Sequence, residues 1–200
     1  VTDGAMLVVD NRSAEVLAWV NVGAFGAEAG SQYDAVITPR QPGSALKPFV
    51  YALALTKGWT AATIINDAPL SQGVGAGLHS FRNYSRVHYG ELSLRHALGN
   101  SLNVPAVKAI EFVGKGDFLD FLRRAGFASL AKGADFYGEG LALGNGEVTL
   151  FELVQGYTAL ASRGVWRPLA VVRRVRGEGL QEESQLLSPE VSSVIGDILS

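Results

Sequence analysis

The residues best suited to covalent chemistry are Ser44 and Lys47, within residues 41–49, which read Q-P-G-S-A-L-K-P-F. Pro42 and Gly43 break the chain just before the serine, and an apolar i, i+3, i+4 pattern follows, so we expect Ser44 at a helix start. Residues i and i+3 share a helix face, which brings the lysine amine within reach of the serine hydroxyl. A serine needs a base to become a nucleophile, and a lysine is a base only when neutral, a state that burial favours. This pattern predicts a serine nucleophile, Ser44, with Lys47 as its base.

The spacing S-x-x-K is a weak signal alone, because an N-capping serine followed by a solvated lysine gives the same spacing. A second copy occurs at Ser129 and Lys132, between Phe127 and Gly133. No long apolar helix follows that copy, and we assign it to a solvated helix end. We therefore predict that the nucleophile is Ser44.

A second candidate pair, Ser101 and Asn103, stands in the short link between two predicted helices. Two such residues in one turn can point to the same side, where the hydroxyl could relay a proton and the amide could donate and accept hydrogen bonds. Both residue types also cap helices, so capping is an alternative interpretation of the same pattern. Capping and catalysis are compatible, and the residues alone leave both open.

Other classes of function receive little support. The three histidines, His79, His88 and His96, lack the spacing of a metal site, and the chain has no cysteine, so we expect neither a metal nor a cofactor. Spacing does not exclude a Ser-His-Asp triad, although nothing in the sequence recommends one. The net charge is −2 without a long basic run, so we expect no nucleic-acid partner, and no apolar run is long enough to span a membrane.

The elements that must position these residues follow from periodicity and capping signals. The length of 200 residues fits one domain, and 48% hydrophobic residues are enough for a core. Residues 64–87 read as a long turn-rich segment. We expect strands at residues 6–10, 15–22 and 166–176, and helices at residues 46–57, 94–98, 103–112, 117–125, 150–161 and 189–199. Gly126 is placed as a left-handed helix stop, and Thr149 with Glu152 as a capping box. This mixture predicts an α+β fold.

Longer strings resemble the transpeptidase domain of class A penicillin-binding proteins, in which S-x-x-K precedes S-x-N. Residues 40–51 are similar to the active-serine helix of that family. Residues 81–84 and 97–107 are similar to the second-motif region of the family. Residues 141–149 are similar to a segment that leads into a later helix. Residues 6–22 are similar to the first strand pair of the domain. Residues 33–36 resemble the penicillin-binding protein 1C branch.

The resemblance implies the fold of penicillin-binding proteins and serine β-lactamases, with a helical body packed on an antiparallel sheet. It also implies a D,D-transpeptidase that cross-links peptidoglycan stem peptides through a serine acyl-enzyme and is inhibited by β-lactams. In that family, Ser44 would attack the penultimate D-Ala carbonyl and Lys47 would be the base. Ser101 would relay a proton to the leaving group, Asn103 would hold the substrate amide, and the Ser44 N–H would form half of the oxyanion hole. The full-length protein would be membrane-anchored at the periplasmic face, with a glycosyltransferase domain.

The sequence departs from the family in one respect, since the third motif, K-T-G, is absent from these 200 residues. In the family it lies on a strand beyond a helix like that expected at residues 189–199. We therefore expect residues 1–200 to be a partial transpeptidase domain, with an incomplete sheet and an open edge. Two alternatives remain: a non-catalytic penicillin-sensing or cell-wall-binding module, and a serine hydrolase of the D,D-carboxypeptidase or β-lactamase type.

Overall fold

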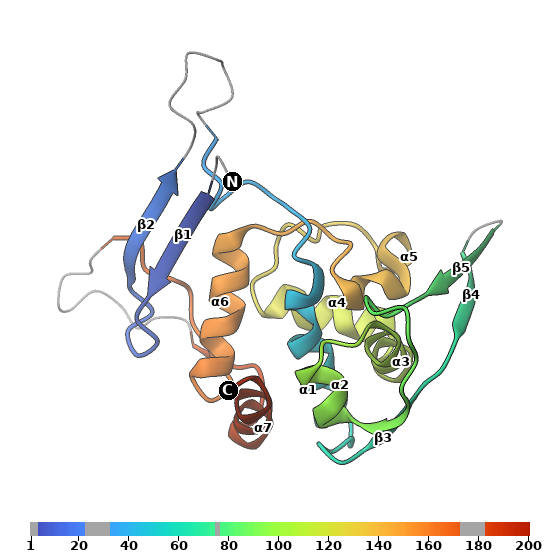
Figure 1. The fold of residues 1–200 in the computed structure, drawn as a ribbon. Coiled ribbons are helices and arrows are strands. Elements are labelled where there is room, and N and C mark those ends of the chain that lie inside the picture. Colours follow the sequence, from blue (N-terminus) through green and yellow to red (C-terminus); the bar gives the residue numbers. More distant parts are fainter. Residues whose placement is uncertain (1–3, 23–32, 75–76, 173–182) are drawn as a thin grey trace.

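The computed structural model describes residues 4–22, 33–74, 77–172 and 183–200. In these ranges a body of helices carries pairs of antiparallel strands at its margins, which confirms the α+β prediction (Figure 1). The helices are η1 (Gly43–Leu46), α1 (Lys47–Thr56), α2 (Leu94–Gly99), α3 (Asn103–Val113), α4 (Lys115–Arg124), α5 (Ala134–Tyr137), η2 (Gly138–Leu143), α6 (Leu150–Ala161) and α7 (Pro189–Leu199). The strands are β1 (Gly4–Val9), β2 (Val16–Val22), β3 (Ile64–Asp67), β4 (Leu70–Val74), β5 (Gly77–Phe81), β6 (Gly90–Ser93), β7 (Val165–Trp166) and β8 (Ser184–Gln185).

Helix α1 forms the centre of the core. All eight residues from Lys47 to Ala54 are buried, and the helix contacts α2, α3, α4 and α7. A helix with apolar residues on every side must be surrounded by other elements, which is why this one is enclosed. The Phe49 ring meets Phe127 and Tyr157 edge to face, with centroids 5.2 and 5.4 Å apart. The serine predicted at the start of this helix is therefore attached to the most enclosed element of the described chain.

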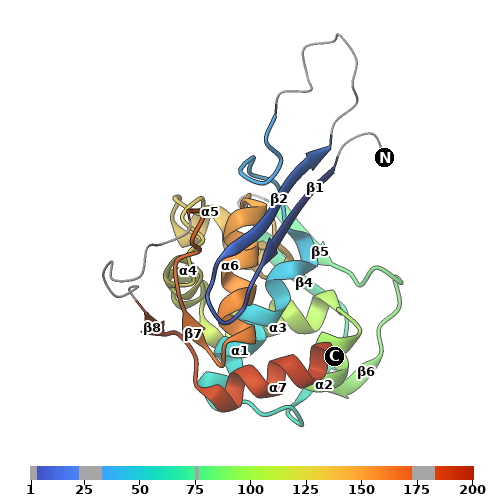
Figure 2. The ribbon, with the colours of Figure 1, turned by 90° about the vertical axis from the view of Figure 1, so that its left-hand side faces the viewer.

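The hairpin of β1 and β2 lies beside α6, on the side of that helix away from α1 (Figures 1 and 2). Its inner face packs Trp19 against Phe151, with ring centroids 5.9 Å apart. Met6, Val8 and Val20 lie on the opposite face and are 53%, 39% and 37% exposed. These strands confirm the pair predicted for residues 6–22, to within two residues at each end.

The segment predicted as turn-rich contains three strands. Strand β3 pairs with β6 in the register Ile64↔Ser93 to Asp67↔Gly90, and β4 pairs with β5 as a hairpin. The prediction failed because β3 and β6 are four residues each and find partners far along the chain, so neither shows a local period. This ladder leads directly into α2, and thus helps to place the turn that carries Ser101.

The helix ends largely follow their local signals. Thr149 and Glu152 form the predicted capping box of α6, with hydrogen bonds of 3.0 and 2.9 Å. Gly126 follows α4 with a φ of +99°, as expected for a helix stop. Helix α4 begins two residues earlier than predicted, at Lys115, because α3 and α4 are separated only by Gly114, whose φ is +88°.

The strand predicted for residues 166–176 is reduced to β7, which ends at Trp166. Pro168 has no N–H to give to a ladder, which accounts for the early end. Beyond it, Ala170 makes one isolated bridge to Glu15, and residues 173–176 lie outside the described part of the chain.

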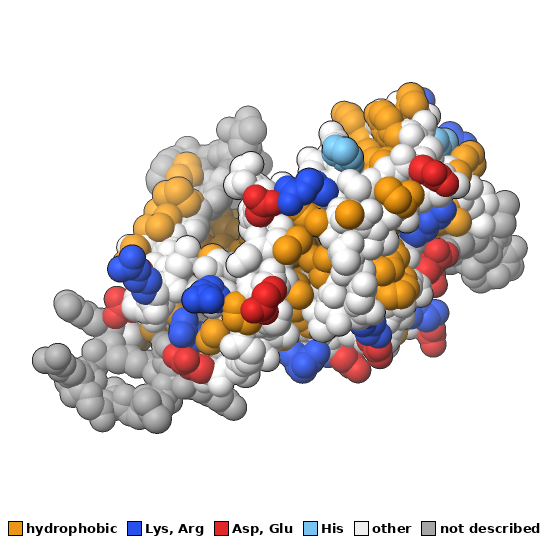
Figure 3. All heavy atoms as spheres, turned by 90° about the horizontal axis from the view of Figure 1, so that it is seen from below, with side chains coloured by type: hydrophobic (Ala, Val, Ile, Leu, Met, Phe, Trp, Pro, Cys, Tyr) orange, Lys and Arg blue, Asp and Glu red, His pale blue; other side chains and the backbone are white. Residues whose placement is uncertain are grey.

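The molecular surface mixes charges of both signs. Figure 3 shows basic and acidic side chains interspersed with hydrophobic ones over the face seen from below. Exposed ion pairs such as Lys57–Asp117 and Arg95–Asp197 add little stability because water screens them. In the ranges that the structure covers, no helix combines the length and the apolar character needed to cross a bilayer.

Candidate active site

Ser44 lies in η1, a single 3-10 turn that runs without a break into α1. Its side chain does not cap either helix, since the N-cap residues are Pro42 for η1 and Leu46 for α1. Ser44 is exposed, whereas every residue from Leu46 to Ala54 is buried. The predicted position at a helix start is thus observed, with the hydroxyl-bearing residue accessible to a substrate.

Lys47 is the first residue of α1, and its side chain is 1% exposed. Its Nζ donates hydrogen bonds to the backbone carbonyl of Ser101, to Ser101 Oγ at 3.2 Å and to Asn103 Oδ1 at 2.7 Å. Burial lowers the pKa of Lys47 from 10.5 to about 8, because a desolvated ammonium is disfavoured. At pH 7 about a tenth of the lysine would then be neutral. A neutral amine here can take a proton from a hydroxyl group.

The Lys47 amine joins the two predicted motifs, although not as the sequence suggested. Among the described residues its hydrogen bonds go to the turn at Ser101 and Asn103, and none goes to Ser44. The spacing that brings the amine within reach of Ser44 does not produce a hydrogen bond between the two among the described residues. Hydrogen bonds of a catalytic base are often incomplete without substrate, so the arrangement remains compatible with proton transfer.

The capping interpretation holds in part. Asn103 is not a cap, because the N-cap residue of α3 is Leu102 and no side chain caps that helix. Ser101 follows the Asn100 C-cap of α2, and the N–H groups of Ser101 and Leu102 donate to the carbonyls of Leu98 and Ala97.

Asn103 Nδ2 donates to the carbonyl of Arg82 at 2.8 Å, while its Oδ1 accepts from the lysine. Ser101 has a φ of +52°, in the left-handed region that non-glycine residues rarely occupy. This left-handed residue ends α2, and the turn it forms brings the Ser101 hydroxyl within hydrogen-bond distance of Lys47 Nζ.

A buried polar pair behind the turn fixes Asn103. Asn83 Oδ1 accepts from the backbone N–H of Asn103 at 2.8 Å and from that of Val104 at 3.3 Å. Asn83 Nδ2 donates to Asp67 Oδ2 at 2.7 Å, and Asp67 is fully buried at the end of β3. The same carboxylate oxygen accepts from the N–H of Tyr89 at 2.9 Å. The β3–β6 ladder is thereby connected through two side chains to the start of α3.

The other oxygen of Asp67 faces a second buried group. The pKa of Tyr51, from α1, is raised by burial and by the negative charge of Asp67. His88 Nδ1 lies 3.5 Å from Asp67 Oδ1. Asp67 Oδ1, Tyr51 OH and His88 Nδ1 are buried and make no hydrogen bond in the described chain.

A close backbone contact fixes the Ser44 turn from the other side. Gly144, with a φ of +74°, lies against Gly43, and a Cβ added to it would be 2.2 Å from the Gly43 oxygen and 2.4 Å from its nitrogen. Tyr157 OH also donates to the carbonyl of Ala45 at 3.1 Å. The sequence analysis predicted neither support. The local signal was the run Gly144-Asn145-Gly146 after η2, which is typical of a tight turn.

The second S-x-x-K copy has a different environment. Ser129 lies in a turn rather than at a helix end, and both its N–H and its Oγ donate to Glu152 Oε1, at 2.7 and 2.9 Å. Lys132 is exposed, with its Nζ 3.9 Å from the centre of the Phe136 ring. The predicted helix end is wrong because Gly126 has already terminated α4. No metal-binding group of three or more His, Asp or Glu residues occurs in the ranges that the structure describes.

An exposed serine just before a core helix, a buried lysine and an S-x-N turn are the arrangement expected of the penicillin-recognising class of proteins. Comparison with known sequences agrees with this class. Residues 4–194 match the family model described as "Penicillin binding protein transpeptidase domain". The chain therefore belongs to the transpeptidase-domain family of penicillin-binding proteins.

Individual relatives place it with the class A proteins. Penicillin-binding protein 1A of Neisseria meningitidis serogroup A is 35% identical over 164 residues, which cover 80% of this chain and 20% of that protein. Penicillin-binding protein 1A of Vibrio cholerae is 35% identical over 158 residues, covering 77% and 18%. The chain thus spans about a fifth of the length of these relatives. They support class A membership, and they do not confirm the predicted 1C branch.

Solved structures confirm the fold. Penicillin-binding protein 1A from Haemophilus influenzae superposes with a TM-score of 0.82 at 23% identity, over 98% of this chain and 34% of that one. A peptidoglycan glycosyltransferase from Burkholderia ambifaria gives 0.80 at 21% identity, over 98% and 64%. The predicted penicillin-binding protein and β-lactamase-like fold is therefore correct.

Proposed function

We propose that this chain is the catalytic part of a D,D-transpeptidase that cross-links peptidoglycan stem peptides through an acyl-enzyme on Ser44. The observation that carries the proposal is the position of the Lys47 amine. It is buried one helical turn from the exposed Ser44 and hydrogen-bonded to both Ser101 and Asn103. Family membership supports the same function.

In the first half-reaction Ser44 Oγ attacks the penultimate D-Ala carbonyl, and neutral Lys47 takes the serine proton. The C–N bond to the terminal D-Ala breaks, and the leaving amine receives that proton through the Ser101 hydroxyl. The amide of Asn103 holds the substrate backbone, and the Ser44 N–H stabilises the oxyanion. In the second half-reaction an amine of a neighbouring stem takes the acyl group and restores Ser44.

A β-lactam imitates the donor peptide and would acylate the same serine. We propose further that residues 1–200 are part of a larger domain that supplies the K-T-G motif. The full-length protein would be anchored in the inner membrane, face the periplasm and carry a glycosyltransferase domain. The matched relatives are about five times as long as the aligned segment, which supports a longer protein.

The test is covalent labelling of the full-length protein by a fluorescent penicillin. We expect one adduct, located by peptide mass spectrometry on Ser44 and lost in Ser44→Ala. Ser129→Ala is the matched control, since Ser129 belongs to the other S-x-x-K copy and is occupied by Glu152. Labelling that survives Ser44→Ala would overturn the proposal.

The alternatives are separated by what the acyl-enzyme does next. Rapid release of hydrolysed penicillin would indicate a β-lactamase, and D-Ala release without cross-links would indicate a carboxypeptidase. Stable labelling without any turnover of stem peptides would indicate a penicillin-sensing or cell-wall-binding module.

A further inference from the structure

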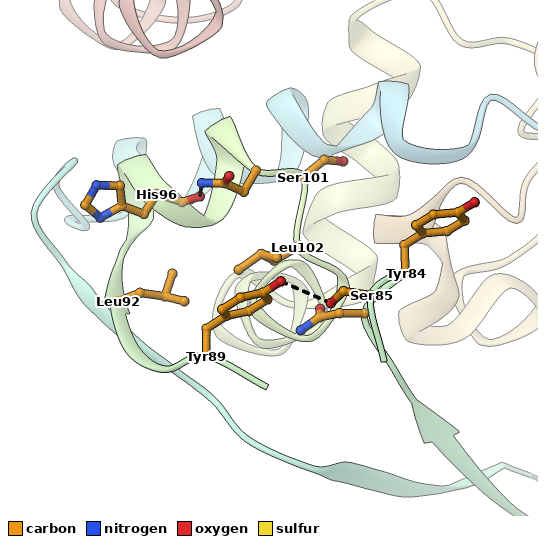
Figure 4. A pocket seen from close by; sticks show the side chains of 9 residues that line it. Tyr84, Ser85, Tyr89, Leu92, His96, Ser101 and Leu102 are labelled. Atoms are coloured by element: carbon orange, nitrogen blue, oxygen red, sulfur yellow. Dashed lines mark hydrogen bonds between the residues drawn. The ribbon is translucent and has the colours of Figure 1, made fainter. Parts of the chain in front are cut away.

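The loop between β5 and β6 lies across a pocket from the S-x-N turn. Figure 4 shows Tyr84, Ser85 and Tyr89 of the loop, with Ser101 and Leu102 of the turn on the other side. The side chains of Tyr84 and Tyr89 are exposed, so burial of these rings does not hold the loop in place. Polar contacts at the two ends of the loop fix its position instead.

One carboxylate oxygen binds both ends of this loop. Asp67 Oδ2 accepts from Asn83 Nδ2 at 2.7 Å and from the N–H of Tyr89 at 2.9 Å. Asp67 is fully buried at the end of β3, and burying a carboxylate without a cationic partner is costly. Among the described residues the one ion-pair candidate is His88, whose Nδ1 lies 3.5 Å from Asp67 Oδ1. A side chain that is costly to bury in this way suggests a role beyond stability.

The amide of Asn83 connects Asp67 to the S-x-N turn. Its Nδ2 donates to Asp67 Oδ2 and to the carbonyl of Val87, at 2.7 and 2.9 Å. Its Oδ1 accepts from the N–H groups of Asn103 and Val104, at 2.8 and 3.3 Å. An amide has two donor hydrogens and two acceptor lone pairs, so all of them are used. The opposite orientation would place the amide oxygen against the carboxylate, so Asp67 fixes the orientation observed.

Asn103 is held in turn by the segment that contains Asn83. Its N–H binds Asn83 Oδ1, and its Nδ2 donates to the carbonyl of Arg82 at 2.8 Å. The remaining polar atom of its side chain, Oδ1, accepts from Lys47 Nζ at 2.7 Å. A continuous chain of hydrogen bonds thus runs from Asp67 to the predicted base.

We propose that Asp67 is a positioning residue for acylation, acting through Asn83 on Asn103. The proposal rests on the transpeptidase function proposed above. With Asn103 held in place, its amide oxygen keeps the Lys47 amine in the site. The role depends on where the carboxylate oxygen lies rather than on its charge, since each link in the chain is a hydrogen bond.

The test separates the position of the oxygen from the charge of the carboxylate. In Asp67→Asn the amide oxygen can take the place of Oδ2, with the amide nitrogen facing the unpartnered Nδ1 of His88. Asp67→Glu keeps the charge and moves it by about 1.5 Å, the length of one carbon–carbon bond. Labelling by a fluorescent penicillin should stay within about twofold of the wild-type rate in Asp67→Asn, because both hydrogen bonds are kept. It should be about tenfold slower in Asp67→Glu, since a misplacement of about 1 Å can cost up to about a hundredfold.

A second readout is the pH dependence of labelling. The hydrogen-bond partners of the Lys47 amine are uncharged, and burial is the cause of its lowered pKa. An acceptor stabilises the ammonium form, so losing the Asn103 oxygen should lower the pKa of Lys47 further. The midpoint of the pH–rate profile should therefore move to lower pH in Asp67→Glu and stay unchanged in Asp67→Asn. A loss of stability alone would not move this midpoint.

Matched controls are Glu152→Gln and Glu152→Asp, which make the same two kinds of change at another buried carboxylate. Glu152 accepts from the N–H groups of Ser129 and Thr149, at 2.7 and 2.9 Å, and takes no part in the chain from Asp67 to Lys47. These variants should unfold at lower temperature and keep both the labelling rate and the midpoint. All measurements use the full-length protein at a temperature where every variant is folded.

Wild-type labelling in Asp67→Glu, or an equal loss in Asp67→Asn and Asp67→Glu, would overturn the positioning role. An equal loss in the Glu152 controls would also overturn it, since the rate would then follow stability. Asp67→Ala replaces Asp67→Glu if the longer side chain prevents folding, with the same expected loss and shift. In all these cases labelling still requires Ser44 and the transpeptidase proposal stands, whereas labelling that does not require Ser44 would refute that proposal itself.

Discussion

Replacing Gly144 by alanine should damage the candidate active site from a position outside its four predicted catalytic residues. The added Cβ would stand 2.2 Å from the Gly43 oxygen and 2.7 Å from its carbonyl carbon. Ordinary contact begins at 3.4 Å, so one backbone must move by about 1.2 Å. Gly43 precedes the nucleophile directly, and its displacement is transmitted to Ser44.

The expected loss can be estimated from that shift. A misplacement of about 1 Å in a catalytic group can cost about a hundredfold in rate, or about 2.7 kcal/mol. A left-handed alanine costs a further 1–2 kcal/mol, roughly, in the folded state, because Gly144 has a φ of +74°. We expect acylation of Gly144→Ala by penicillin to be about a hundredfold slower, with a fold that remains intact.

The assay is the second-order rate of labelling by a fluorescent penicillin, measured beside thermal unfolding. Gly90→Ala is the matched control, since Gly90 has a φ of +70° and nothing within 4 Å of an added Cβ. It should lose a similar stability to strain and keep its labelling rate. Equal labelling rates for the two variants would refute the argument that Gly144 positions the Ser44 turn.

Three further predictions concern the base and its supports. The acylation rate should rise between pH 6 and 9 with a midpoint near pH 8. Burial lowers the pKa of Lys47 to about 8, and only the neutral lysine is a base. A midpoint near pH 10 would contradict this prediction. Asn83→Ala removes a donor to buried Asp67 and should lower the free energy of unfolding by about 1–3 kcal/mol in urea titrations. Acylation should also become slower. An unchanged urea midpoint of unfolding would contradict this prediction. Tyr157→Phe loses one hydrogen bond to the η1 backbone and should cost about 1 kcal/mol in the same titration, whereas no change would mean that this bond contributes nothing.

The parts of the fold that sequence predicted are those governed by neighbouring residues. The capping box at Thr149 and the stop at Gly126 are local signals, and both are observed. The β3–β6 ladder was missed because it joins short segments that are far apart in the chain. The early end of β7 could have been predicted, since Pro168 was visible in the sequence.

In the candidate site too, local sequence predicted some features, and others depend on contacts between distant parts of the chain. Spacing placed Ser44 at the start of the central helix, and motif order associated it with Ser101 and Asn103. Spacing alone suggested that Lys47 would contact Ser44, whereas the folded chain directs its amine to the S-x-N turn. The close approach of Gly144 to the nucleophile turn depends on how η2 packs against η1, which no local pattern reveals.

The burial of α1 has a consequence for how the site responds to fluctuations. A helix enclosed on every side opens only when most of the molecule unfolds, so its amide hydrogens should exchange with solvent at the rate set by global unfolding. The side chains of Tyr84 and Tyr89 are exposed, so the loop that carries them has less packing to lose. Lys47, the first residue of α1, should therefore keep its buried position on every timescale shorter than that of global unfolding.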